Sequence, residues 1–256
     1  MMPDVHGASA VRNRILNGLA LADLYSLRPH LQPVTLKERA VLQEPRAPIE
    51  HVYFIETGLV SLRTSTAGNV IETAMVGCHG AVGALVALGA EAPIHHSSVL
   101  VAGRALRIAA GDLHRLMVER PSVRDRLLKY VQALMVHGSQ TALCAACHEL
   151  EPRLACWLSI ACDALDGDVL PVTHDHLSVI LKLRRAGLTE ALIRFEEEGL
   201  IHKSRGVIHV LERPVLRDRA CGCYRIVSHA YGIGRSHHVA HARDGDRLAP
   251  SETRLS

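Results

Sequence analysis

The chain has 256 residues, and its 29 lysines and arginines against 26 acidic residues give a formal charge of +3. An apolar content of 48% with 21% charged residues supplies a sizeable core and excludes a generally disordered chain. Two phenylalanines, one tryptophan and five tyrosines are too few for a surface that stacks single-stranded bases. At roughly 150 residues per domain, the length predicts one large or two small domains.

The first residues predict neither a secretory signal nor a membrane anchor, because they lack a continuous apolar stretch. The longest uncharged run, residues 74–90, is interrupted by four glycines and predicts short strands rather than a spanning helix. Seven cysteines without the spacing of a small secreted domain favour a reduced, cytoplasmic protein.

The N-terminal half contains two successive sequence patterns, the first helical and the second strand-like. Residues 11–30 place apolar side chains at steps of three and four, which predicts short amphipathic helices. From about Val34, short apolar runs alternate with turn residues, and Ala67-Gly68-Asn69 predicts a hairpin. Many short strands with glycine turns are typical of an antiparallel, jelly-roll-like β-roll. We expect this roll to be a sensor domain over residues 12–112.

A long helix is predicted next, within residues 113–148. Residues 121–147 contain no internal proline, and apolar or small residues step by four and three in a heptad seam. The seam consists of Leu127, Val131, Leu134, Gly138 and Thr141. Such a seam favours dimerisation through a parallel partner helix in a homodimer. The alternative is an ordinary core helix packed on the roll.

Residues 149–225 predict a DNA-binding domain. After an amphipathic helix, Thr173 can cap a short helix, and a second helix is expected from Arg185 to Glu198, before Gly199. Residues 200–211 alternate apolar and polar around a turn, as in a hairpin. Helix, tight turn, helix and hairpin form a winged helix-turn-helix, which places its second helix in the major groove of double-stranded DNA. The fold class is therefore α+β, and residues 226–256 are expected to be a disordered tail.

The charges of this segment fit such docking. Base-edge contacts are expected from the start and outer side of the second helix, at Arg184, Arg185, Thr189 and Glu190. Phosphate contacts are expected around it, at Thr173, Lys182, Arg194, Lys203 and Arg205. The alternative is that these charges are solvated helix ends, or that the helix-turn-helix serves protein contacts in a signalling module.

The segment RRAGLTEALIRFEEEGLI resembles the recognition helix of the Crp–Fnr family of bacterial transcription regulators. VYFIETGLVSL and ETAMVGCHGAVG resemble strands of that family's cyclic-nucleotide-binding-like roll, so the resemblance covers roughly residues 12–225. It implies a cytoplasmic homodimer that reads a pseudo-palindromic operator, with RNA polymerase as a further partner if the protein is an activator. Whether it activates or represses, and through which effector, does not follow from the sequence.

This chain departs from the family's recognition pattern. Crp-like members present Arg-Glu at the start of the recognition helix and a further arginine one turn on. Arg185 keeps the first place, whereas Ala186 and Glu190 stand at the other two, and the usual glycine of the turn corresponds to Lys182. We therefore expect an operator unlike the family's best-known sites.

The effector pocket departs further. Cyclic-nucleotide binders of the family use Gly-Glu for the ribose and Arg-Ser for the cyclic phosphate. Here Gly83 is followed by Ala84, and the later position falls near His95-His96-Ser97. Because a buried phosphate needs a cation and backbone donors, we expect a degenerate pocket that binds neither cyclic AMP nor cyclic GMP. No cofactor is expected.

Metal and enzyme functions receive little support. The first cysteine is Cys78, so the N-terminal cluster needed for Fnr-type iron–sulfur sensing is missing. No metal is expected, but two thiol pairs are weak candidates for a metal- or thiol-responsive regulator: Cys144, Cys147, Cys221 and Cys223. The alternative is that these cysteines are small buried hydrophobic residues. The sequence contains none of the common catalytic motifs, so we do not expect an enzyme.

Overall fold

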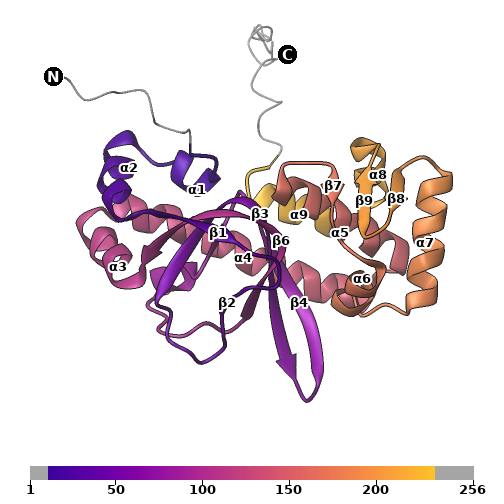
Figure 1. The fold of residues 1–256 in the computed structure, drawn as a ribbon, viewed down its shortest axis with the longest axis horizontal. Helices are drawn as coiled ribbons and strands as arrows, with labels where there is room; N and C mark the ends of the chain where they lie inside the picture. The colour runs from indigo at the N-terminus through magenta and orange to yellow at the C-terminus, as the bar shows by residue number, and fades with distance from the viewer. Residues whose placement is uncertain (1–10, 234–256) are drawn as a thin grey trace, which may run out of the picture.

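The computed structural model describes residues 11–233, which form a β-roll and a helical C-terminal part joined by one long helix (Figure 1). The predicted α+β fold class is confirmed. The chain enters through short helices α1 (Arg14–Asn17) and α2 (Leu21–Leu27) and the 3-10 turn η1 (Arg28–His30). Asn13 caps α1, and its side chain also donates to the backbone oxygens of Ile55 and Gly80, which ties the entry to the roll.

The roll is a six-stranded antiparallel sheet. Four strands lie in the order β1-β6-β3-β4, while β2 pairs with β6 and β5 pairs with β3. The strands are β1 (Gln32–Leu36), β2 (Val41–Gln43), β3 (His51–Thr66), β4 (Asn69–Val76), β5 (Ala81–Val82) and β6 (His96–Ala109). The predicted hairpin joins β3 to β4, with positive φ at Ala67 (47°) and Gly68 (78°), as a two-residue hairpin turn requires.

The two longest strands, β3 and β6, bend across each other at glycines. A Cβ at Gly103 would lie 2.0 Å from the Thr57 carbonyl oxygen, and one at Gly58 (φ +90°) would lie 2.6 Å from that of Val101. The register between these strands shifts three times in this region. The bends curl the sheet, and its apolar face closes over the long helix.

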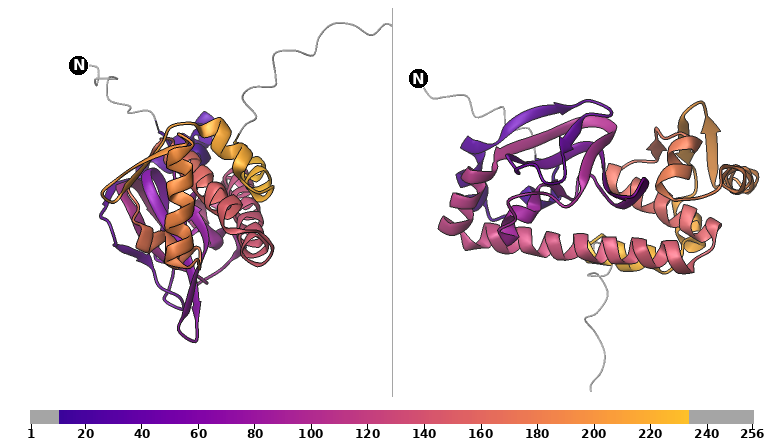
Figure 2. Two further views of the ribbon diagram at one scale, coloured as in Figure 1. Left: turned by 90° about the vertical axis from the view of Figure 1, so that its right-hand side faces the viewer. Right: turned by 90° about the horizontal axis from the view of Figure 1, so that it is seen from below.

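The long helix α4 (Pro121–Cys147) follows α3 (Ala110–Glu119) and runs beneath both parts of the molecule (Figure 2, right). Leu127 and Val131 are almost fully buried in the same core as Phe54 of the roll. Leu134 packs against the core of the sheet, and Thr141 lines an interior cavity.

The prediction that the heptad seam faces a partner helix is therefore wrong. Its residues face this chain's own roll because the curled sheet and the 3-10 helix η2 (Ala84–Leu88) supply the apolar surface that covers them.

The C-terminal part packs around α5 (Leu150–Leu165). Trp157, Leu188 and Phe195 share one buried core, and Gly77 of the roll approaches so closely that a Cβ would lie 2.0 Å from the Ala164 carbonyl oxygen. The remaining elements are β7 (Val169–Leu170), α6 (His174–Ile180), α7 (Arg185–Glu197), β8 (Ile201–Ser204), β9 (Val207–Val210), α8 (Arg213–Arg219) and α9 (Cys223–Ala230). Strands β7, β9 and β8 form a second antiparallel sheet, in that order.

The expected disordered tail begins too early at residue 226, because α9 continues to Ala230 and packs on α4. Val227 is buried, and the Tyr231 ring lies 4.3 Å from that of His79, centroid to centroid. Burial of these apolar and aromatic side chains stabilises a segment whose polar neighbours suggest a loop. The rest of the expected tail, residues 234–256, lies outside the described residues. Among residues 11–233, no helix combines the length and the apolar character that a membrane crossing requires.

Candidate nucleic-acid interface

Helices α6 and α7 form the predicted helix-turn-helix, with α7 at the right-hand edge of the molecule in Figure 1 and facing the viewer in Figure 2, left. Thr173 caps α6, because its hydroxyl oxygen accepts a hydrogen bond from the His176 backbone amide at 3.2 Å. Leu177, Ile180 and Leu188 are buried in one core, which fixes the angle between the two helices. The exposed side of α7 is thereby turned toward solvent.

Lys182 occupies the turn between these helices in a left-handed conformation, with φ at +51°. That backbone conformation is the one a glycine adopts most easily, which agrees with the prediction that Lys182 replaces a glycine. Its ammonium group donates to the Asn69 side-chain oxygen at 3.2 Å, on the tip of the β3–β4 hairpin. Lys182 therefore connects the helix-turn-helix to the roll.

The start of α7 presents two exposed arginines. Arg184 holds the N-cap position without a side-chain cap, so the first backbone amides of α7 donate to no acceptor on its side chain. Arg185 is 70% exposed, and its guanidinium lies 3.0 Å from an Asp175 carboxylate oxygen. A helix N-terminus with unsatisfied amides beside two guanidinium groups attracts anions such as phosphate.

The other predicted contact residues of α7 differ in their exposure and in the groups that they contact. Glu190 is exposed, whereas Thr189 is half-buried and its hydroxyl donates to the Arg185 carbonyl oxygen at 2.9 Å. Arg194 forms an ion pair with Glu151 at the start of α5. The structure thus places Arg194 where it holds α7 against α5.

In the wing, which β8 and β9 form, the side chains of Lys203 and Arg205 have different surroundings. Lys203 is largely buried, and its ammonium group lies 3.0 Å from Glu196, which also accepts a hydrogen bond from the Lys203 backbone amide at 2.7 Å. That backbone bond lowers the pKa of Glu196. Arg205 stands at the exposed tip next to Gly206 (φ +75°) and has no ion-pair partner within residues 11–233.

A single hollow brings several of these residues together. It lies between the starts of α6 and α7 and the wing, and Thr173, Arg185, Lys203 and Arg205 line it. Burial first, and then the charges of Lys203 and Arg185, lower the pKa of His174 in its wall, which favours a neutral imidazole. Predicted base-contact and phosphate-contact residues therefore share one continuous concave surface.

The predicted effector positions are distributed over the roll. Gly83 (φ +89°) precedes η2, and a Cβ there would lie 2.8 Å from the Gln43 amide nitrogen. Gln43 in turn pairs with Ser97, so the structure brings the two predicted halves of the pocket near each other. Ala84 is buried and offers only a methyl group where a ribose acceptor is expected.

The sequence analysis did not identify Arg63. Its guanidinium donates to the Ser98 hydroxyl oxygen at 2.6 Å and lies 3.4 Å from His96 Nδ1, across the β3–β6 pairing. With His96 and Ser98, it lines a hollow that faces Thr173 and His176 of the helix-turn-helix. No signal in the sequence identifies this partner, because the register between the two strands is shifted by bulges.

Three of the four candidate cysteines meet in space. Cys144, Cys221 and Cys223 lie together at the end of α4, whereas Cys147 is exposed and outside the group. The fourth member is His148, whose place four residues after Cys144 was the available signal.

Comparisons with known proteins agree with this geometry. Residues 152–219 match the family model described as a Crp-like helix-turn-helix domain. A search of curated proteins gives no match to the sequence. Among solved structures, FixK2 from Bradyrhizobium japonicum has a TM-score of 0.64 and 14% identity, covering 74% of this chain and 97% of that chain.

Two further structures are similar to the same extent. CLP from Xanthomonas campestris, described as a c-di-GMP responsive global regulator, has a TM-score of 0.59 and 14% identity, covering 75% of this chain and 100% of that chain. A transcriptional regulator of the CRP/FNR family from Thermus thermophilus has a TM-score of 0.58 and 21% identity, covering 74% and 98%. The resemblance predicted from the sequence is confirmed for the fold and for the helix-turn-helix domain.

Proposed function

We propose that this chain, which has a Crp-like helix-turn-helix domain and the fold of Crp–Fnr regulators, is a homodimeric transcription regulator that reads a pseudo-palindromic operator. The observation that carries the proposal is the exposed start of α7 beside the wing, where Arg184, Arg185 and Arg205 stand free of the core. Guanidinium groups in this position match guanine edges and phosphates in the major groove.

The predicted DNA-contact residues differ in whether they are free in solvent or already contact other side chains of the protein. Arg184, Arg185 and Glu190 are exposed and are proposed to meet base edges, while Thr173 and Arg205 meet phosphates. Lys182, Arg194 and Lys203 already contact Asn69, Glu151 and Glu196, so we propose that they position the helices and the wing. Thr189 contributes mainly to the first turn of α7.

A different face of α4 is proposed to form the dimer. Turned away from the roll, exposed residues again step by three and four: Gln132, Met135, Ser139 and Ala142. Met135 is 65% exposed, and the small Ser139 and Ala142 allow a partner helix to approach closely. Two parallel copies of α4 would set two α7 helices on one side of a duplex, as two half-sites about one helical turn apart require.

Control by cyclic AMP or cyclic GMP is not part of the proposal. Ala84 supplies no carboxylate for the ribose, and the Arg63 guanidinium beside His96 already bonds to Ser98. Losing two charge-assisted contacts of about 1.5–3 kcal/mol each leaves no physiological affinity. Isothermal titration calorimetry should give no heat at micromolar concentrations of either nucleotide, and low-micromolar binding would contradict this part of the proposal.

The direct test is a titration of duplex DNA with the intact protein, followed by fluorescence anisotropy. The wild type should bind genomic fragments with a steep dependence on salt, and the variant carrying Arg184→Ala, Arg185→Ala and Arg205→Ala should lose this binding while keeping its fold. A control variant, Arg115→Ala, changes an exposed, ion-paired arginine of α3 outside the proposed interface and should bind as the wild type does. Equal binding by the triple variant would refute the proposed interface.

A further inference from the structure

Four potential metal ligands converge where α4 ends. The Sγ atoms of Cys144, Cys221 and Cys223 and a ring nitrogen of His148 all lie within 4.8 Å of one another. We propose that these four residues form a tetrahedral site for a divalent cation of the zinc class. The site is independent of α7 and of the roll pocket.

The separations fit the edges of a metal-centred tetrahedron. Zinc binds thiolate at about 2.3 Å and imidazole at about 2.0–2.1 Å, which places two sulfurs about 3.8 Å apart and sulfur and nitrogen about 3.6 Å apart. The Cys144 and Cys221 sulfurs are 3.4 Å apart, and the Cys223 sulfur lies 3.6 Å from His148 Nδ1. The other pairs lie within 4.8 Å, so a cation fits after shifts of about 1 Å or less.

Two chain segments supply the ligands in pairs. Cys144 lies in the last turn of α4, and His148 is the residue that follows the helix, where its backbone amide donates to the Cys144 carbonyl oxygen at 3.2 Å. Cys221 lies in the turn between α8 and α9, where its backbone amide donates to the Pro152 carbonyl oxygen at 3.3 Å, and Cys223 is the first residue of α9. A chelate from two segments is the usual construction of a structural zinc site.

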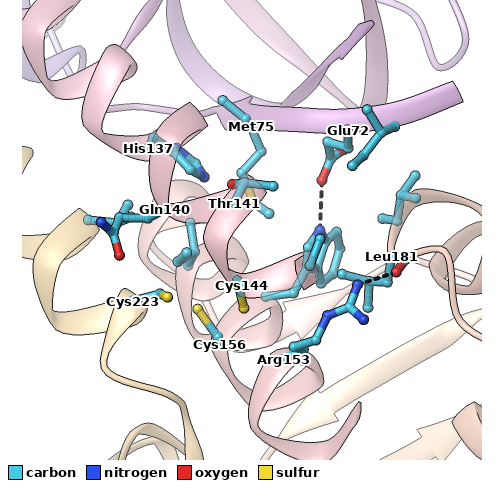
Figure 3. Close-up of a pocket in the computed structure, with 17 residues that line it drawn as sticks. Glu72, Met75, His137, Gln140, Thr141, Cys144, Arg153, Cys156, Leu181 and Cys223 are labelled. Carbon is cyan, nitrogen blue, oxygen red and sulfur yellow. Dashed lines mark hydrogen bonds between the residues drawn. The ribbon is translucent and has the colours of Figure 1, made fainter. Parts of the chain in front are cut away.

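The surroundings favour metal binding over isolated thiols. Cys144 and Cys223 are buried and Cys221 is half-buried, so three thiols meet away from bulk water, with His148 at the open side. The sulfurs of Cys144, Cys156 and Cys223 point toward one another in Figure 3.

Neighbouring cysteines define the boundary of the site. Cys147 is exposed and lies outside the group, although the sequence pattern C-x2-C made it a candidate. Cys156 is buried and lines the same pocket as Cys144 and Cys223, but its sulfur is not among the four ligand atoms that lie close together. His148 replaces both as the fourth ligand.

A bound cation would connect the end of α4 to the segment that leaves the winged helix. The free energy of metal binding would then stabilise the contact between α9 and α4. The bound cation would also hold the winged helix more firmly against α4. Any effect of this on DNA binding rests on the proposed function. The metal site itself does not.

The test is a titration of the full-length, reduced and chelator-treated protein with Co²⁺ under anaerobic conditions. We expect one equivalent of Co²⁺ per chain, with the charge-transfer and visible absorption of tetrahedral thiolate coordination, and displacement by Zn²⁺. Thiolate-to-cobalt charge transfer separates this site from histidines elsewhere in the chain, which lack sulfur. The readout requires no DNA, so its failure is distinct from failure of the proposed function.

Variants locate the ligands. Cys223→Ser should weaken Co²⁺ binding by at least about 100-fold, since even outer-shell changes cost 10–100-fold. Cys147→Ser and Cys156→Ser should retain the full equivalent and the thiolate bands. A wild-type protein without thiolate bands would overturn the proposal, and so would Cys147→Ser losing the metal as Cys223→Ser does.

Discussion

Arg185 and Arg205 are both exposed arginines of the proposed interface, but they belong to different secondary structures. Arg185 lies on the first turn of a helix and is oriented by Asp175, whereas Arg205 stands at the tip of a hairpin turn. An oriented guanidinium can select one base, while a guanidinium on a hairpin tip acts mainly through its charge. The two residues should therefore fail in different ways when replaced.

Arg185→Ala should relax the preference at one base position of each half-site, with a loss of about 1–3 kcal/mol of discrimination there. Arg205→Ala should weaken binding to all sequences alike and reduce the slope of log K against log salt by about 1. Competition binding with single-base operator variants at several salt concentrations measures both effects. An unchanged consensus for Arg185→Ala would show that α7 enters the groove in another register.

Two buried histidines make the stability depend on pH. Burial lowers the pKa of His137 to about 4, and burial together with the charges of His137 and Arg14 lowers that of His79 to about 3. The unfolded chain takes up protons on these groups below about pH 6.5, and the folded chain does not. The free energy of unfolding should therefore fall as the pH drops from about 6.5, by up to about 1.4 kcal/mol per pH unit for each histidine.

Glu72 acts in the opposite direction. Burial raises its pKa to about 6, so between about pH 4.5 and 6 the folded state holds a proton that the unfolded state has lost. Glu72→Gln removes this contribution while keeping an acceptor for Trp157, which donates at 2.7 Å. Denaturation at a series of pH values should show a steeper loss of stability for Glu72→Gln in that window. A wild-type stability that stays constant down to pH 5 would contradict the histidine assignments, and equal slopes for the wild type and Glu72→Gln would contradict that of Glu72.

At the scale of elements, α4 shows which structural features a sequence pattern predicts and which it leaves open. Its bounds, Pro121–Cys147, follow from the sequence, because a proline opens the helix and no other interrupts it. The heptad spacing correctly identifies the buried face, but spacing alone does not say whether a sheet or a partner helix buries it. That depends on how far β3 and β6 curl, which is a property of bulges and glycine contacts distant in sequence.

For α7, too, the sequence predicts the element but not the contacts of its charged side chains. Its helix-turn-helix is readable from Thr173, the buried leucines and Gly199, whereas the states of its charged side chains depend on neighbours from other elements. Arg194 meets Glu151 of α5, and Gly187 faces α5 so closely that a Cβ would lie 3.0 Å from Leu150. A larger side chain at position 187 would therefore require the tip of the Leu150 side chain to shift.

The proposed dimer face of α4 gives a prediction at this scale. Met135→Lys places a charge in the centre of the exposed stripe and should shift the protein from dimer to monomer. Val118→Lys changes an apolar side chain of α3 that is 70% exposed, outside the stripe, and should leave the mass unchanged. Analytical ultracentrifugation over a concentration series distinguishes the two. A dimer that persists in Met135→Lys would place the interface elsewhere.

For the whole molecule, the important contacts are those between the roll and the winged helix. Lys182 reaches Asn69, the Cys78 backbone amide donates to the Ala164 carbonyl oxygen at 2.9 Å, and Arg63 faces α6 across a shared hollow. None of these pairs is visible in the sequence, because each joins segments about 85 to 115 residues apart. A ligand of the roll can change DNA binding only by favouring one arrangement of these contacts over another.

The central claim is that two copies of α7 read one duplex by symmetry. Selection of bound duplexes from a random pool by the intact protein tests it most directly. We predict a two-fold symmetric consensus with half-site centres about 34 Å apart, the spacing of one helical turn. No enrichment, or a consensus without two-fold symmetry, would contradict the account.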